Sequence, residues 1–187
     1  MTFKTMKLTD IMTREDIVEN LRAENMLGNY LELGVMRADG LKIWNKYRPK
    51  RLIGIDVWAN DGNPSVTNNL STEFINNCYN QSIQYMLEHP NIQLIKAYTQ
   101  DMAKFFPDDF FDFIYVDDDH SKPATLRSLK LWWPKVVSGG LLCGHDYTHQ
   151  FGVIEAVHEF LPTIEISRFH YTEDNPASFI IEKPCKE

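Results

Sequence analysis

Residues 51–57 read Arg-Leu-Ile-Gly-Ile-Asp-Val. The consecutive residues 52–55 carry no polar side chain, so both faces of an extended chain would be apolar there. Such a run is typical of a strand inside a parallel sheet, where helices cover both faces. Residues 38–47 before it have a helical pattern that Pro49 ends, and residues 71–87 after it have another that Pro90 ends. The pattern therefore predicts a strand placed between two helices.

The same alternation of strand and helix continues in both directions along the chain. Further strands are expected at residues 30–35, 92–97, 111–116 and 141–143, the last after a turn at Gly139 and Gly140. Further helices are expected at residues 99–106, 124–133 and 153–161, and one more begins with Thr13 as N-cap and Asp16 three residues on, and ends near Gly28. Residues 164–169 and 178–182 are expected to form a terminal hairpin.

Strands that alternate with helices indicate right-handed β-α-β units and an α/β fold with a parallel sheet. Two consecutive strands at the end should pair antiparallel, so we expect a seven-stranded, mostly parallel sheet with one reversed strand and helices on both faces. The 187 residues are predicted to form a single domain, with residues 1–27 as an N-terminal helical extension and residues 28–187 as the core. The N-terminal helix can pack on its own sheet or on a partner, which leaves a homo-oligomer open.

Composition and charge narrow the function. The chain is 43% hydrophobic and 24% charged, an ordinary globular balance. Its formal net charge of −7 repels phosphate backbones, so we expect no nucleic-acid partner. The cysteines Cys78, Cys143 and Cys185 are far apart and form no C-x-x-C motif, which favours a reducing compartment. Without an apolar leader or an apolar run of about 18 residues, a cytoplasmic, soluble protein with no membrane partner is expected.

Ligands of such sheets bind at the carboxyl ends of the strands, so the residues found there are the candidate site. Glu32 is an acidic residue within an apolar strand and is costly to bury unless a cation, such as an ammonium group, accompanies it. Gly34 follows it and would allow a ligand close to the backbone. Asp56 ends the next strand, where a carboxylate can accept both hydroxyls of a ribose. Thr99 is either an N-cap or a contact to an adenine edge.

The other half of the rim carries acids and histidines. Asp117, Asp118 and Asp119 follow a buried strand and should repel one another unless a divalent cation compensates them. The alternative is a solvated turn with an N-cap. His120 comes next, and His145 and Asp146 end the neighbouring strand. Either histidine can act as a base or as a metal ligand.

The residues that carry a family resemblance are Y-L-E-L-G-V, L-I-G-I-D-V-W and F-D-F-I-Y-V-D-D-D-H, followed by L-W-W-P-K-V-V-S-G-G-L-L-C-G-H-D-Y and F-G-V-I-E-A-V-H-E-F. Over residues 29–161 the chain resembles class I S-adenosylmethionine-dependent methyltransferases, and most of all the small-molecule branch that includes macrocin-type O-methyltransferases. Residues 111–147 are the most specific part. The resemblance implies a Rossmann-like sheet, S-adenosylmethionine as cofactor, and methyl transfer to a hydroxyl of a small-molecule acceptor, with magnesium in the metal-dependent members.

The resemblance also implies a role for each matching residue. Glu32 and Gly34 would hold the methionine end of the cofactor, and Asp56 its ribose. The adenine would lie against Val57 and Trp58 and contact Gln100 and Asp101. Asp117 and Asp146 would bind magnesium, with Asp117 also at the cofactor. Asp119, His120 and His145 occupy positions of a general base or a further ligand, and His145 is the one expected to join the two aspartates at the metal.

Two departures from the family pattern stand out. The chain reads Arg37-Ala38-Asp39-Gly40 where a second glycine pair is common, and Asp118 replaces the glycine of D-G-D-H. Acceptor contacts would come from residues 1–27, 58–70 or 147–152, or from another subunit. Two other classes compete with this interpretation. They are a non-catalytic module that binds the cofactor, and another nucleotide-dependent enzyme such as a dehydrogenase, against which the absence of G-x-G-x-x-G argues.

Overall fold

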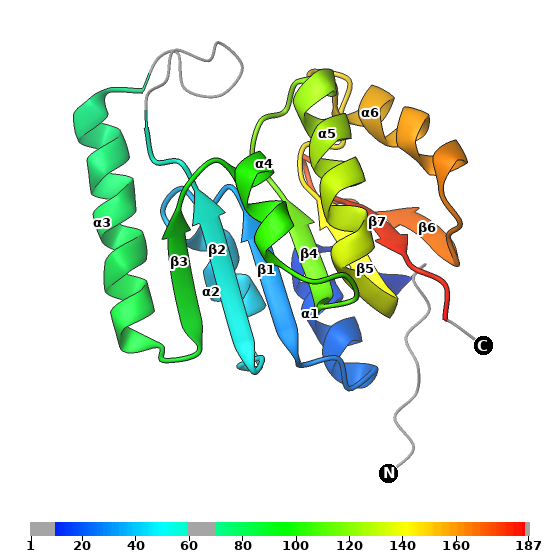
Figure 1. Ribbon diagram of the computed structural model, residues 1–187, viewed down its shortest axis with the longest axis horizontal. Coiled ribbons are helices and arrows are strands. Elements are labelled where there is room, and N and C mark those ends of the chain that lie inside the picture. The colour runs from blue at the N-terminus through cyan, green and yellow to red at the C-terminus, as the bar shows by residue number, and fades with distance from the viewer. Residues whose placement is uncertain (1–9, 60–69, 186–187) are drawn as a thin grey trace.

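The computed structural model describes residues 10–59 and 70–185 and contains a seven-stranded sheet of order β3-β2-β1-β4-β5-β7-β6 (Figure 1). The strands are β1 (Asn29–Leu33), β2 (Arg51–Asp56), β3 (Ile92–Lys96), β4 (Phe111–Val116), β5 (Val136–Gly144), β6 (Arg168–Tyr171) and β7 (Phe179–Glu182). Strands β1 to β5 pair in parallel, whereas β7 lies antiparallel between β5 and β6. The predicted α/β sheet with one reversed strand is confirmed.

Helices cover both faces of this sheet (Figure 1). Helices α1 (Arg14–Ala23), α2 (Asp39–Trp44) and α3 (Thr72–Glu88) pack on one face, and α4 (Thr99–Met102), α5 (Lys122–Trp132) and α6 (Val153–Phe160) on the other. Short 3-10 helices follow at η2 (Ala103–Phe105), η3 (Trp133–Lys135) and η4 (Leu161–Thr163). Successive side chains of a strand point to opposite faces. Tyr30 therefore packs with α1 and Leu31 with α5, and Glu32 faces the same side as Tyr30.

Helix α1 begins as predicted but ends earlier. Asp16 N–H donates to Thr13 Oγ1 at 3.2 Å and Thr13 N–H donates to the Asp16 carboxylate at 2.9 Å, which completes a capping box. The helix ends at Ala23 rather than near Gly28, because Asn25 adopts a left-handed conformation with φ of 57°. Asparagine tolerates this conformation and can end a helix as glycine does. The buried face of α1 packs on the protein's own sheet.

Two expected boundaries near the C-terminus are wrong. Gly139 and Gly140 are not a turn before a strand, since β5 already starts at Val136 and includes both. Gly139 has φ of 76°, and the pairing with β4 shifts register there, so the glycines form an irregularity within the strand. The strand expected at residues 164–169 is β6 at Arg168–Tyr171, because η4 first prolongs helix α6. Within the described ranges, no helix has both the length and the apolar character that crossing a bilayer requires.

Candidate active site

A cavity of about 660 Å³ opens at the carboxyl ends of the parallel strands, beside the point where the strand order reverses between β1 and β4. Many of the residues predicted from the sequence line it, namely Glu32, Gly34, Asp56, Val57, Trp58, Gln100, Asp117, Asp119, His120 and His145. Asp101 is exposed on α4 and lies outside the cavity wall. The carboxylate of Asp146 is buried directly beside Asp117 and His120. The fold thus gathers nearly all the predicted residues at one place.

Glu32 is a buried acid in the middle of β1. It is 2% exposed, and its Oε2 has no hydrogen-bond partner in the part of the chain that the structure describes. Gly40 leaves room for it, since a Cβ at that position would collide with Glu32 Oε1. Burial raises the pKa of Glu32 well above its ordinary value of 4.5, and the nearby charge of Asp117 raises it further. A buried carboxylate of this kind is costly unless a ligand brings a positive charge or donors to it.

Glu32→Gln is therefore expected to stabilise the ligand-free protein at neutral and alkaline pH by about 1–3 kcal/mol. Because the folded-state pKa is raised, the folded protein binds this proton more tightly than the unfolded chain does. The wild type should lose stability, relative to the variant, as the pH rises from about 4.5 through the raised folded-state pKa. Urea unfolding at pH 4, 6 and 8 measures this difference. The exposed Glu165→Gln is the control, and a variant less stable than the wild type at every pH would contradict the prediction.

Asp56 ties two loops of the site together. Its Oδ2 accepts the N–H groups of Val35 and Met36 at 2.8 and 2.9 Å, and its Oδ1 accepts the N–H of Trp58 at 2.7 Å. A carboxylate has about four acceptor sites. Three of these sites are taken by the backbone donors, and one on Oδ1 stays open to a ribose hydroxyl.

Trp58 is a packed residue as well as part of the cavity wall. It is 4% exposed, its Nε1 donates to Met36 O at 2.8 Å, and its ring lies 4.9 Å from the ring of Tyr79. The indole is therefore held firmly where the loop after β2 turns.

The three consecutive aspartates have different surroundings. Asp118 turns away and accepts the hydroxyls of Thr99 at 2.6 Å and Ser128 at 3.1 Å, although burial still raises its pKa. Asp119 accepts the N–H of Ser121 at 2.8 Å at the start of α5. Thr99 is not an N-cap, because α4 has no side-chain cap. Backbone and hydroxyl donors therefore serve two of the three acids, which leaves Asp117 as the one of the three that could be a ligand of the expected cation.

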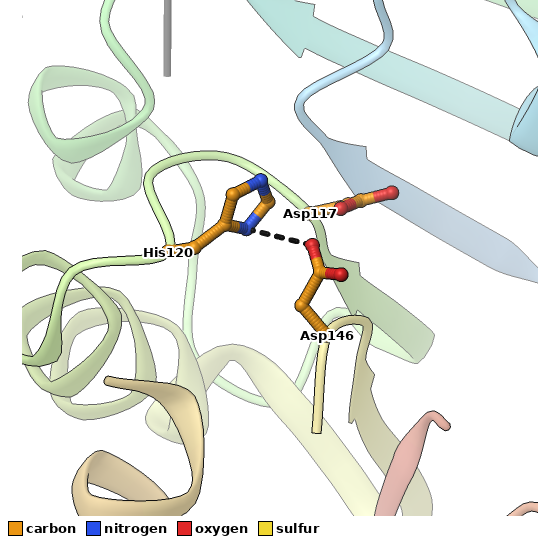
Figure 2. Close-up of side chains that lie close together, drawn as sticks. All are labelled: Asp117, His120 and Asp146. Atoms are coloured by element: carbon orange, nitrogen blue, oxygen red, sulfur yellow. Dashed lines mark ion pairs between the residues drawn. The ribbon is translucent and has the colours of Figure 1, made fainter. Parts of the chain in front are cut away.

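Asp117, the third of these aspartates, lies close to His120 and Asp146 (Figure 2). One possible ligand atom from each of these residues lies within 4.8 Å of the others, and His120 Nδ1 is 3.1 Å from Asp146 Oδ2. His145 Nδ1 is 3.6 Å from both Asp117 Oδ1 and Asp146 Oδ2. Among the described residues, the set that could hold a metal therefore contains His120 in the place where the sequence suggested His145.

The carboxylates also set the charge of His145. Burial acts to lower the pKa of this imidazole, but hydrogen bonding and charge interaction with Asp117 and Asp146 raise it to about 9. The pKa of Asp146 is lowered, because the histidines outweigh the effect of its own burial. The two carboxylates therefore favour the charged form of His145, whose single positive charge offsets part of theirs.

Sequence reasoning missed Arg14, which lines the cavity from the first residue of α1. A signal for it exists. Cations are disfavoured in the first turn of a helix, where the dipole is positive, so an arginine there needs another reason. Arg127 on α5 and the half-exposed Tyr98 also line the cavity and were not predicted.

Residues 33–147, more than half of the chain, match a family described as a methyltransferase domain. The chain belongs to this methyltransferase domain family. A search of curated proteins found no match to the sequence.

Solved structures share the fold at low sequence identity. A putative rRNA-methylase from Clostridium thermocellum has a TM-score of 0.65 and 14% identity, over 98% of this chain and 99% of that one. A putative caffeoyl-CoA O-methyltransferase from Staphylococcus aureus has a TM-score of 0.64 and 11% identity, over 94% of this chain and 87% of that one. A putative methyltransferase from Streptococcus mutans, solved in complex with SAH, has a TM-score of 0.60 and 14% identity, over 83% of this chain and 88% of that one. The fold is that of S-adenosylmethionine-dependent methyltransferases.

Proposed function

We propose that this protein transfers the methyl group of S-adenosylmethionine to a hydroxyl of a small-molecule acceptor, assisted by a divalent cation. The observation that carries the proposal is the cluster of Asp117, His120 and Asp146 beside the cavity that also contains Glu32. The cavity offers a site for the cofactor, and the cluster offers groups that can activate a hydroxyl next to it.

The cavity fits the cofactor on chemical grounds. Glu32 Oε2 lacks a partner and suits the α-ammonium group of a methionine moiety. Asp56 retains capacity for one ribose hydroxyl, and Gln100 lines the cavity at the start of α4, where it can meet the adenine. The chain's role in the transfer is to hold the acceptor oxygen in line with the methyl group, and such positioning contributes up to about 7–11 kcal/mol.

The acceptor hydroxyl must lose its proton as the new bond to carbon forms. His120 Nδ1 lies 3.1 Å from Asp146 Oδ2, so Nε2, on the other side of the ring, is the nitrogen that would take the proton. A base in this position contributes about 10²–10⁴-fold to the rate. Asp119 and His145 are the weaker candidates, since the first receives the Ser121 N–H and the pKa of the second is raised by the carboxylates of Asp117 and Asp146.

The cluster also fits a metal ion. The two carboxylates offer oxygen ligands, which suit Mg²⁺ or Mn²⁺, and a ring nitrogen of His120 lies within 4.8 Å of them. A divalent cation bound there would orient the hydroxyl and make it more acidic. Asp117 and Asp146 are the residues that would hold it.

Calorimetry with S-adenosylmethionine, S-adenosylhomocysteine and NAD, each with and without magnesium, tests the proposal. We expect binding of the first two and none of NAD. Binding of NAD alone would indicate a dehydrogenase-like enzyme. Binding of S-adenosylhomocysteine without turnover over a panel of hydroxyl acceptors would favour a non-catalytic module. The net charge of −7 supports a small acceptor over RNA, even though one similar structure is described as a putative rRNA-methylase.

A further inference from the structure

The start of helix α1 is fixed at the edge of the cavity. Glu173 N–H donates to Met12 O at 2.8 Å, and Arg14 N–H donates to Asp174 Oδ2 at 2.8 Å. These bonds join Met12 and the first residue of α1 to the connection between β6 and β7. The capping box of Thr13 holds the first turn from the other side. The backbone of Arg14 is therefore held in place by tertiary contacts.

The side chain of Arg14 is half-buried and lines the cavity. Within residues 10–59 and 70–185 its guanidinium forms no ion pair or side-chain hydrogen bond. It lies on the side of the sheet that Glu32 faces, since α1 packs on that side. Burial raises the pKa of Glu32, and the charge of Arg14 is near enough to act in the opposite direction. The cavity thus has a buried acid and an available cation on the same side.

The other arginines of the cavity are placed differently. Arg37 is paired with Asp39, and its side chain is 54% exposed. Arg127 belongs to α5, which covers the opposite face of the sheet. Arg14 also sits in the first turn of its helix, where the dipole disfavours a cation and favours an anion. Among the described residues, Arg14 is therefore the cavity arginine that lies on the Glu32 side and has no acidic partner.

We propose that Arg14 binds the α-carboxylate of the methionine moiety of the cofactor while Glu32 faces the α-ammonium group. An amino acid moiety carries both charges about two bonds apart, so its site needs an anion and a cation on one side. A guanidinium can donate two parallel hydrogen bonds to a carboxylate. This assignment rests on the proposed use of S-adenosylmethionine.

Calorimetry with two ligands tests Arg14, namely S-adenosylhomocysteine and its analogue that lacks the carboxylate. The wild type should bind S-adenosylhomocysteine at least about 10-fold more tightly than the analogue, as expected for a charged hydrogen bond. Arg14→Gln should weaken S-adenosylhomocysteine binding by about 10–100-fold and leave the analogue unchanged. Arg14→Lys should recover part of the loss.

Arg127→Gln is the matched control, since it removes an arginine that lines the same cavity but belongs to the opposite face of the sheet. It should keep the wild-type preference between the two ligands, and the melting temperature of Arg14→Gln should not fall below that of the wild type. An equal loss for both ligands in Arg14→Gln would indicate a structural role and overturn the proposal. Unchanged S-adenosylhomocysteine affinity with a raised KM for a carboxylate-bearing acceptor would also overturn it. A wild type that binds neither ligand would instead refute the proposed function itself.

Discussion

Asp117→Asn combined with Asp146→Asn is expected to abolish divalent-cation binding and to lower methyl-transfer turnover by at least about 10²-fold. The two carboxylates supply the negative charge of the cluster that Figure 2 shows, and amides are much poorer ligands for Mg²⁺ or Mn²⁺. Mn²⁺ binding followed by electron paramagnetic resonance requires no knowledge of the acceptor. Release of S-adenosylhomocysteine, with and without a chelator, measures turnover once an acceptor has been found.

The single variants separate the metal from the base. A metal site needs both carboxylates, whereas the orientation of His120 needs Asp146 but not Asp117. If Asp117→Asn keeps full turnover while Asp146→Asn loses it, the histidine acts without a metal. Asp108→Asn is the control, because this aspartate is exposed, pairs with Lys135 and precedes β4, whereas Asp117 follows the other end of that strand. A double variant that still binds Mn²⁺ like the wild type would refute the metal assignment.

The strands of the central sheet could be predicted because strands buried on both faces appear in the sequence as short apolar runs. The expected strand at residues 111–116 coincides with β4, and that at residues 51–57 is one residue longer than β2. Once these strands were placed, the parallel order brought Asp56 and Asp117 to the same edge of the sheet. The position of the site followed from local patterns and general topology.

The partners of the side chains could not be predicted in the same way. Asp118 is adjacent to Asp117, yet its carboxylate meets Thr99 and Ser128, which are 19 and 10 residues away in sequence. Such contacts depend on how α4 and α5 pack over the sheet. Likewise, His120 and His145 each follow a strand and stand next to an aspartate in the sequence. The backbone of the two loops decides that Nδ1 of His120 lies 3.1 Å from Asp146 Oδ2.

Helix ends show the same limit. The end of α1 depends on Asn25 taking a left-handed conformation, which many residues other than asparagine and glycine avoid. The helix was predicted to end near Gly28 because glycine often ends helices, but this glycine has a different role. A Cβ at Gly28 would collide with the carboxylate of Asp112, which accepts the N–H of Asn29 at 2.7 Å. A glycine required for close packing looks identical in sequence to one that ends a helix.

Gly34→Ala is expected to destabilise the protein by about 2–5 kcal/mol, because backbone strain and a steric clash act together. Gly34 has φ of 81°, and a Cβ there would collide with the backbone carbonyl oxygen of Asp117. That carbonyl cannot move freely, since the N–H of the same residue donates to Leu33 O at 2.7 Å and so binds the end of β4 to β1. Relief of the clash would therefore pull Asp117 away from the candidate metal cluster.

Gly139→Ala provides a matched control for the strain alone. Its φ of 76° is close to that of Gly34, but the nearest atom to its Cβ would be the Cys185 Sγ at 3.3 Å, the end of a side chain. The control should cost about 1 kcal/mol. Urea unfolding of both variants isolates the contribution of the clash, and S-adenosylhomocysteine and Mn²⁺ affinities report its effect on the site. Equal destabilisation of the two variants would show that the approach of Asp117 to Gly34 does not matter, and the rim would then tolerate a side chain where the structure leaves no room for one.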